Sequence, residues 1–382
     1  MKKYLILLTA VFSAVFLSCF LTGTNSPGAL IDRDFQNIHY QDRISRINDS
    51  STVKLAVIYD KDASLESAAY QMMAAYTAII NASGGINGKK VELISGNGGY
   101  YLSDYLAEVQ ELCVKSDVAA CIGPFNSSFV IPARAITDFA SVPLLSFSTV
   151  YSETLPSLDD DNYASVFPPL KKLSDLILSG MKQQNIHTIL IISPEQGTYG
   201  DLFSTQLERQ GRSKGAFQEV YRVSYQSPLR NEDVAGMIRI VLRSHHIDAV
   251  FFAGNEADLN SLAEQLNPGN LKVPVFATEM VNTKAIRQHG YPCHLYVPNF
   301  RLTQQEKQRL DRISSNFADN NYFISYLSVY LMDCLKEILE KNGYDPVSLP
   351  EQIRSKSQEF YSGTAAHEKL ELLDIGLMKN AP

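Results

Sequence analysis

Short apolar runs alternate with stretches of helical periodicity along most of this chain, and this alternation limits its possible folds more than any other feature. Residues 54–58 and 188–192 have the length and composition of buried strands, while residues 65–82 and 199–210 carry apolar side chains at helical spacing. Repeated strand, helix and strand units predict parallel sheets, because a parallel connection needs a crossover of a dozen or more residues. We therefore expect an α/β protein.

The remaining elements continue the same alternation. Further strands are expected at residues 91–95, 118–122, 142–145, 219–223, 249–252, 273–277, 295–297 and 370–377. Further helices are expected at residues 106–112, 131–139, 171–183, 231–244, 256–265 and 322–341. Roughly 330 residues follow Thr52, which is more than one hydrophobic core usually takes, and 45% of the chain is apolar. Two lobes are therefore expected.

The first residues have the pattern of an export signal. Lys2 and Lys3 precede an apolar stretch, residues 4–17, that is too short to predict a membrane span. Phe-Leu-Ser-Cys at residues 16–19 resembles the lipobox of bacterial lipoproteins, although Phe16 stands where an aliphatic residue is usual. We expect residues 1–19 to be a lipoprotein signal peptide with lipidation at Cys19. An uncleaved anchor or cleavage without lipidation are the alternatives, and each places the rest of the chain outside the cytoplasm.

Residues 20–52 contain Gly, Asn, Ser, Pro and mixed charge with little apolar periodicity, which is typical of a tether. The globular part is expected to begin near Val53. The chain has a formal net charge of −7 and no stripe of Lys and Arg, so nucleic acid is not expected as a partner. The interpretation up to this point is a tethered, extracytoplasmic, two-lobed protein.

Two neighbouring strands are expected to end in loops rich in hydroxyl groups. The strand at 118–122 leads through Gly and Pro to Ser127 at the start of a helix, and the strand at 142–145 leads to Ser148 and Thr149. The carboxyl ends of parallel strands form the usual ligand crevice of such a sheet, and a helix start offers N–H groups to an anion. Ser127 taken alone is more often an ordinary helix cap than a ligand contact, and the pair of loops together favours a site.

Signals for enzymes, metals and cofactors are weak. No G-x-S-x-G, H-E-x-x-H or C-x-x-C motif occurs, and Tyr101 occupies the third glycine position of a dinucleotide fingerprint that would begin at Gly96. We therefore predict no enzyme activity, no metal and no cofactor. Cys113 and Cys121 fall on a helix and the next strand, where they are either core residues or partners in a disulfide.

The chain resembles the type I periplasmic binding proteins, in particular the Leu/Ile/Val-binding group that provides the substrate-binding proteins of branched-chain amino-acid ABC transporters. The resemblance runs from Val53 to Lys341 and rests on four segments in order, at residues 81–88, 122–128, 142–149 and 198–201. It implies two Rossmann-like lobes with parallel sheets, joined by a three-strand hinge. The implied lobes are 53–151 with 299–362 (lobe I) and 152–298 with 363–382 (lobe II).

The resemblance also implies a ligand site between the lobes. Its candidate residues are Phe125, Asn126, Ser127, Ser148, Thr149, Tyr199, Asn255 and Glu279. In the family the α-carboxylate of an amino acid meets the positions of Ser127, Ser148 and Thr149. Its ammonium group meets that of Glu279, while Tyr199 closes over the ligand. Without the resemblance, Glu279 would be interpreted as a solvated charge at a strand end or as an acid in the first turn of a helix.

Several positions depart from the family. The loop at 59–66 is shorter than usual, Val150 replaces a frequent Thr, Asn255 replaces an aromatic residue, and the usual Phe-Asp-x-x-Gly-Asp segment is missing after Gly363. These departures imply a remodelled pocket, so the ligand need not be leucine or even an amino acid.

We expect a membrane-anchored, extracytoplasmic lipoprotein that captures a small ligand, an amino acid or a related compound, and delivers it to an ABC permease and ATPase. Two alternatives stay open. One is a ligand-sensing module for a membrane receptor or kinase. The other is a ligand-free envelope lipoprotein that activates peptidoglycan synthesis.

Overall fold

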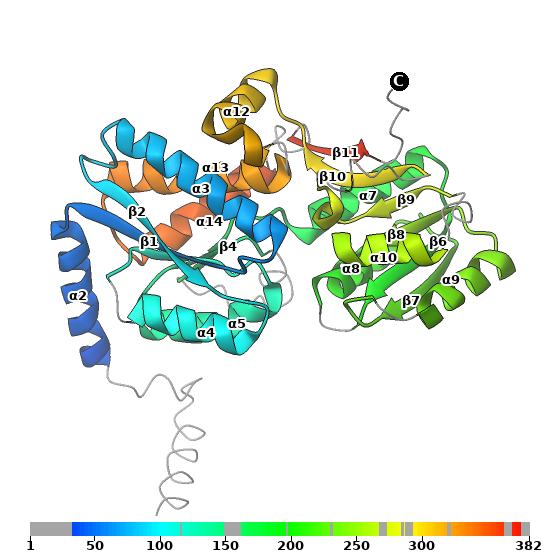
Figure 1. Cartoon of the computed structure of the whole chain (residues 1–382), viewed down its shortest axis with the longest axis horizontal. Coiled ribbons are helices and arrows are strands. Elements are labelled where there is room, and N and C mark those ends of the chain that lie inside the picture. Colours follow the sequence, from blue (N-terminus) through cyan, green and yellow to red (C-terminus); the bar gives the residue numbers. More distant parts are fainter. Residues whose placement is uncertain are drawn as a thin grey trace, which may run out of the picture. The chain divides into compact units, whose positions relative to one another are not determined.

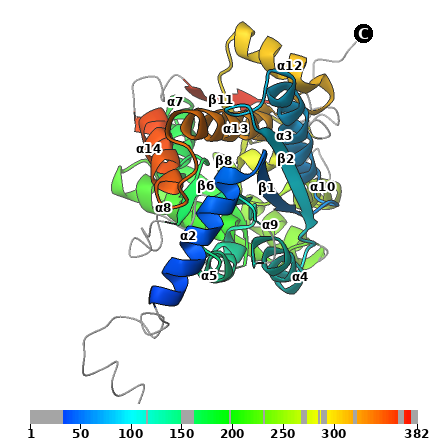
Figure 2. The ribbon, with the colours of Figure 1, turned by 90° about the vertical axis from the view of Figure 1, so that its left-hand side faces the viewer.

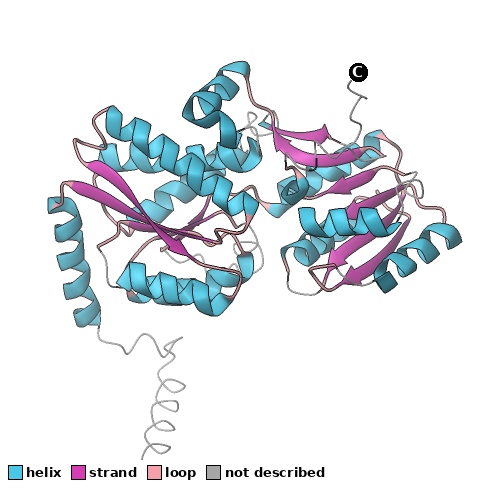
Figure 3. Cartoon of the chain, viewed as in Figure 1, coloured by secondary structure: helices cyan, strands magenta, loops and turns pink. Residues whose placement is uncertain are grey.

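The strands of the protein form two separate sheets, shown in magenta in Figure 3. The computed structural model describes residues 33–114, 117–148, 162–195, 198–229, 232–266, 273–283, 286, 293–318, 322–362 and 369–375. Helix α2 (Arg33–Asp49) belongs to a first unit, Met1–Asp49, and the rest of the chain forms a second compact unit, Ser50–Pro382. Residues 33–49 contain neither Gly nor Pro, which permits a helix within the segment interpreted as a tether.

The first sheet has five parallel strands in the order β2-β1-β3-β4-β5 (Figure 1). They are β1 (Thr52–Tyr59), β2 (Lys90–Asn97), β3 (Ala120–Ile122), β4 (Leu144–Ser146) and β5 (Tyr163–Ser165). The short strand β5 was not expected, and it extends this sheet beyond residue 151, where the first segment of lobe I was expected to end.

Helices cover the first sheet on both faces. On one face lie α3 (Ser64–Ala82), α12 (Gln304–Ala318), α13 (Tyr322–Asn342) and α14 (Ser348–Ser362). On the other lie α4 (Leu102–Val109), the π-helix η2 (Gln110–Val114), the 3₁₀ turn η3 (Ser127–Phe129) and α5 (Val130–Phe139). Figure 2 shows α4 and α5 side by side, and the two helices are in contact. α12 and α14 were not expected from the sequence.

The second sheet has six strands in the order β11-β10-β9-β8-β6-β7. They are β6 (Thr188–Pro194), β7 (Glu219–Tyr225), β8 (Ala249–Phe252), β9 (Val275–Ala277), β10 (Leu295–Phe300) and β11 (Leu370–Asp374). All neighbours pair in parallel except β11, which runs antiparallel to β10. Its helical elements are α7 (Leu170–Gln183), α8 (Tyr199–Ser213), α9 (Glu232–Ser244), α10 (Glu256–Leu266) and the 3₁₀ turn η6 (Glu279–Val281).

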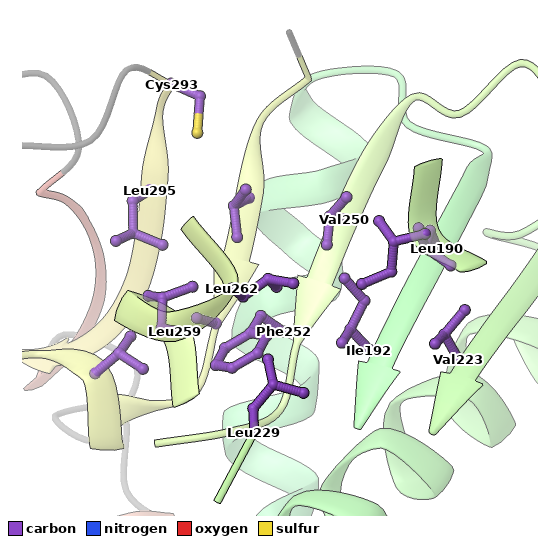
Figure 4. Close-up of a cluster of buried hydrophobic side chains, with 14 of the residues drawn as sticks. Leu190, Ile192, Val223, Leu229, Val250, Phe252, Leu259, Leu262, Cys293 and Leu295 are labelled. Carbon is purple, nitrogen blue, oxygen red and sulfur yellow. The ribbon is translucent and has the colours of Figure 1, made fainter. Parts of the chain in front are cut away.

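Alternation along the strands creates the core of the second lobe. Leu190, Ile192, Val250 and Phe252 belong to one buried cluster, in which Leu259 and Leu262 of α10 lie beside Phe252 (Figure 4). Their neighbours Ile189, Ile191 and Phe251 are equally buried and, by the two-residue period, point to the opposite face of the sheet. Strands buried on both faces are continuously apolar, which explains why their sequences could be recognised.

The chain passes between the two sheets three times, after β5, after β10 and between α14 and β11. The predicted architecture of two α/β lobes with mostly parallel sheets is confirmed. None of the described helices combines the length and the apolar character needed to cross a membrane.

Candidate functional site

The predicted residues of lobe I lie after the carboxyl ends of β3 and β4, which are neighbours in the sheet. We call Phe125, Asn126, Ser127, Phe147 and Ser148 the lobe I edge. Thr149 and Cys19, which the sequence analysis also singled out, lie outside the described residues.

Asn126, and not Ser127, caps the helical segment at this edge. The Oδ1 atom of Asn126 accepts hydrogen bonds from the backbone N–H of Ser128 at 3.1 Å and from its hydroxyl at 2.9 Å. Ser127 is the half-buried first residue of η3, and among the described residues its hydroxyl has no hydrogen-bond partner. The capping interpretation of Ser127 is therefore wrong, and its hydroxyl remains available to a ligand.

Two aromatic rings join the neighbouring loops of the lobe I edge. Phe125 and Phe147 stack with 4.8 Å between ring centroids and 7° between ring planes. Phe147 is buried and Phe125 is half-buried, so the outer ring covers the inner one. The stack fixes the two loops relative to each other and places an apolar surface beside Ser127.

The loop after β4 is held by a residue of the unexpected strand β5. The hydroxyl groups of Tyr163 and Ser146 are 2.7 Å apart, and the Tyr163 hydroxyl donates to the carbonyl oxygen of Ser148 at 3.1 Å. The Oγ atom of Ser148 itself is buried and lacks a hydrogen-bond partner among the described residues. A buried hydroxyl without a partner is costly, so this position favours an additional polar contact.

Lobe II contributes three candidate residues from three adjacent strands. Tyr199 follows β6, Asn255 follows β8 and Glu279 follows β9, and the sheet order places β8 between the other two. We call these three residues the lobe II edge. The carboxyl ends of these strands therefore bring an aromatic ring, an amide and a carboxyl group to the same border of the sheet.

Gly200 explains how Tyr199 reaches that border. A Cβ atom at position 200 would lie 1.9 Å from the carbonyl oxygen of Ala253 and 2.8 Å from Pro194. Only glycine therefore allows the first turn of α8 to pack directly against the end of β8. Thr198 caps the helix by accepting from the N–H of Asp201 at 3.2 Å. Thr198 and Gly200 of the Thr-Tyr-Gly-Asp segment thus have structural roles.

The oxygen atom of the Asn255 side chain already has a structural role. Its Oδ1 atom accepts from the backbone N–H of Asp258 at 2.9 Å and so caps α10. The side-chain amide nitrogen is not used in this cap, so Asn255 can offer a ligand a donor and not a free acceptor.

Glu279 is the charged group of the lobe II edge. Its side chain is almost fully buried, and no described residue donates a hydrogen bond of normal geometry to its Oε2 atom. Burial raises the pKa of the carboxyl group to about 7, and the Tyr199 hydroxyl and the local backbone oppose the rise only in part. The interpretation of Glu279 as a solvated charge is therefore wrong.

A second carboxyl group with a raised pKa was missed by sequence reasoning. Glu66, in the first turn of α3, lies near the carboxyl end of β1, and its Oε2 atom accepts from the backbone N–H of Asp60 at 2.7 Å. Burial raises the pKa of Glu66 to about 7. An acid in the first turn of a helix is common, so its sequence carried no signal of this environment. Among the described residues no group of three or more metal-ligating side chains is assembled.

Known proteins resemble this chain in sequence and in fold. The model of the periplasmic binding protein family matches residues 52–321. A curated relative, an amino acid binding protein of Pseudomonas aeruginosa, is 23% identical over 211 residues, and the match spans 53% of either chain, about half of the relative's length.

Solved structures have the same fold. The branched-chain amino acid transporter substrate binding protein LivJ of Streptococcus pneumoniae, in complex with isoleucine, is similar with a TM-score of 0.67 at 15% identity over 79% of this chain and 87% of that one. A solute binding protein of Rhodopseudomonas palustris, in complex with 4-hydroxybenzoate, is similar with a TM-score of 0.65 at 16% identity over 80% of this chain and 84% of that one. At these identities the likeness shows the fold alone.

Proposed function

Because the chain belongs to the periplasmic binding protein family, we propose that it is an extracytoplasmic, membrane-anchored lipoprotein that captures a small ligand between lobe I and lobe II. The ligand is an amino acid or a related compound, and the protein delivers it to an ABC permease and ATPase. Cys19 carries the lipid that holds the protein to the membrane.

The observation that carries the amino-acid assignment is Glu279. A buried carboxyl group whose Oε2 atom lacks a donor is unfavourable in the free protein, and a bound ammonium group would supply both the donor and the opposite charge. Tyr199 lies beside it on the lobe II edge and would cover the ligand.

The lobe I edge complements this charge with neutral donors. The Ser127 and Ser148 hydroxyl groups lack partners among the described residues, and the start of the helical segment offers backbone N–H groups, a set suited to a carboxylate. The Phe125 and Phe147 stack offers an apolar surface for a side chain. The relative from P. aeruginosa is an amino acid binding protein by name, and the LivJ structure contains isoleucine.

A thermal-shift screen of the compact unit Ser50–Pro382, followed by calorimetry, tests the assignment. Amino acids should raise the melting temperature, whereas 4-hydroxybenzoate, which has a carboxylate but no ammonium group, should not. Binding of carboxylates alone would remove the amino-acid assignment and leave the binding function in place. Failure of amino acids, short peptides, nucleosides and aromatic acids to bind would contradict capture of such a ligand.

The membrane anchor has a separate test. The Cys19→Ser variant of the full chain should leave the membrane fraction or remain unprocessed, because the lipid can no longer be attached. A variant that is correctly cleaved and still sediments with membranes would contradict the role of Cys19.

A further inference from the structure

Two thiol groups meet in the core of lobe I. Cys113 lies on the π-helix η2 and Cys121 lies on strand β3, and the structure has both as free cysteines. Both side chains are fully buried in the same hydrophobic cluster, where the Cys121 thiol interacts with that of Cys113. A disulfide would bring the two sulfur atoms to about 2.05 Å, so the two side chains must shift toward each other when it forms.

The other described cysteines have different surroundings. Cys334 on α13 interacts with Tyr330, and Cys293, which precedes β10, lies near Asp374. The paired arrangement thus sets Cys113 and Cys121 apart from these two. The family to which the chain belongs acts outside the cytoplasm, where neighbouring thiols are oxidised.

We propose that Cys113 and Cys121 form a disulfide bond in the mature protein. In this step the thiolate of one cysteine attacks the disulfide of an oxidising partner, a thiol oxidoreductase or oxidised glutathione, and forms a mixed disulfide. The second cysteine then attacks the mixed disulfide, so the Cys113–Cys121 bond forms and the partner leaves as two thiols. The two cysteines lose two electrons and two protons, and the partner gains them.

The bond has to form while lobe I folds. In the folded, reduced chain the Cys113 contact and burial raise the pKa of the Cys121 thiol well above its usual range. The Cys121 thiol is then protonated, and both thiols are buried away from an oxidant. We therefore expect the oxidised form in protein that folds outside the cytoplasm and the reduced form after refolding with a reductant.

The position of this bond gives it a consequence for the site. Cys121 lies on β3, two residues before Gly123, where the loop with Phe125 and Ser127 begins. Gly123 has a φ of +125°, and a Cβ atom there would lie 2.7 Å from both the Ile58 carbonyl oxygen and the Tyr105 hydroxyl. A bond from Cys121 to η2 would fix the strand immediately before this closely packed turn. The inference rests on the extracytoplasmic location and not on the identity of the ligand.

Peptide mapping tests the bond directly. Lys115 separates the two cysteines, so trypsin places them on different peptides, residues 91–115 and 116–134. The full chain is isolated from membranes, denatured with N-ethylmaleimide and digested without reduction. We expect the two peptides to be joined and to separate after reduction. Cys293 and Cys334 should carry the label, which shows that labelling was complete.

Variants show whether the bond stabilises the lobe. The oxidised full chain should melt several degrees above the reduced chain, and Cys113→Ala should abolish the difference, whereas Cys334→Ala should keep it. Maleimide on both Cys113 and Cys121 without reduction, in the isolated protein and after refolding with oxidised glutathione, would overturn the proposal. A bond from either residue to Cys293 or Cys334 would overturn it as well. Mapping of the unaltered chain decides the question even where a variant fails to fold.

Discussion

Each lobe has a carboxyl group with a raised pKa near the carboxyl ends of its strands, and the two groups differ in exposure and in the hydrogen-bond donors that reach them. The pKa of Glu66 in lobe I and that of Glu279 in lobe II are both raised to about 7 by burial. The Oε2 atom of Glu66 accepts the N–H of Asp60 at 2.7 Å, whereas the Oε2 atom of Glu279 has no such donor among the described residues.

A raised pKa therefore does not identify a binding residue by itself. Glu66 is satisfied by the fold, because its hydrogen bond ties the loop after β1 to the first turn of α3. The Oε2 atom of Glu279 still lacks a donor of normal hydrogen-bond geometry among the described residues, although Tyr199 interacts with the carboxyl group. The Oε2 atom of Glu66 already accepts a hydrogen bond, whereas that of Glu279 can still accept one from a ligand.

The largest effect is expected from a substitution that displaces Tyr199 from the lobe II edge. Gly200→Ala places a methyl group 1.9 Å from the Ala253 carbonyl oxygen, a backbone atom that cannot rotate away. The first turn of α8 must shift and take Tyr199 with it. We expect a loss of about 3 kcal/mol or more in the free energy of unfolding, at the upper end of overpacking effects, with loss of ligand binding.

Gly236→Ala on α9 is the matched control. A methyl group added at this position would meet no atom within 4 Å, and alanine is the better helix former, so the free energy of unfolding should rise by about 0.5 to 1 kcal/mol. Denaturant unfolding measures both variants. Equal stability of the two variants would show that α8 does not press on β8.

The second effect should distinguish the carboxyl groups of Glu279 and Glu66 by their role in ligand binding. If the ligand is an α-amino acid, Glu279→Gln removes a charge-assisted hydrogen bond of about 1.5 to 3 kcal/mol and weakens binding about tenfold to a hundredfold. Glu66→Gln, which alters a carboxyl group of similar pKa in the other lobe, should leave the affinity unchanged. Calorimetry measures both. An unaltered affinity in Glu279→Gln would remove the amino-acid assignment, and a loss in Glu66→Gln would place that residue in the site.

The sequence predicts the sheets of the two lobes better than it predicts the surroundings of individual side chains. The βαβ alternation predicted both sheets, because strands buried on two faces are continuously apolar. It missed β5, whose residues Tyr-Ala-Ser do not form an apolar run, and α12, which carries many charged residues. Burial of Glu279 has no local sequence pattern. Asn126 caps the helical segment by accepting the backbone N–H of Ser128, but Asn and Ser are both preferred caps, so the sequence does not choose between Asn126 and Ser127.

The third effect concerns pH, and the two carboxyl groups should again differ. With a pKa of about 7 in the free protein, Glu279 must lose its proton before it can bind an ammonium group. The affinity should therefore fall about tenfold for each pH unit below 7 and become constant above about pH 8. Calorimetry across this range should give a flat profile for Glu279→Gln and an unchanged slope for Glu66→Gln.

The stability of the ligand-free protein should change with pH in the opposite direction. Both carboxyl groups bind a proton more tightly in the folded state than in the unfolded state, where their pKa is near 4.5. Their stabilising contribution is thus fully present below about pH 4.5 and is lost as pH rises through 7. Thermal unfolding should show that stability falls less as the pH rises through 7 in Glu66→Gln and in Glu279→Gln than in the unaltered protein. Affinity and stability that rise together would contradict the assignment of the pKa values.

The smallest effect is expected at the lobe I edge, whose hydrogen-bond donors are uncharged. Ser127→Ala should cost about 0.5 to 1.5 kcal/mol in binding free energy, about two- to tenfold in affinity, because backbone N–H groups at the start of η3 still hold a carboxylate. Ser128→Ala is the matched control, since the exposed Ser128 hydroxyl donates to Asn126, and its loss should leave the affinity unchanged. If Ser127→Ala weakens binding more than Glu279→Gln, the ligand is held mainly by the lobe I edge, and the Glu279 carboxyl group is not the principal determinant of affinity.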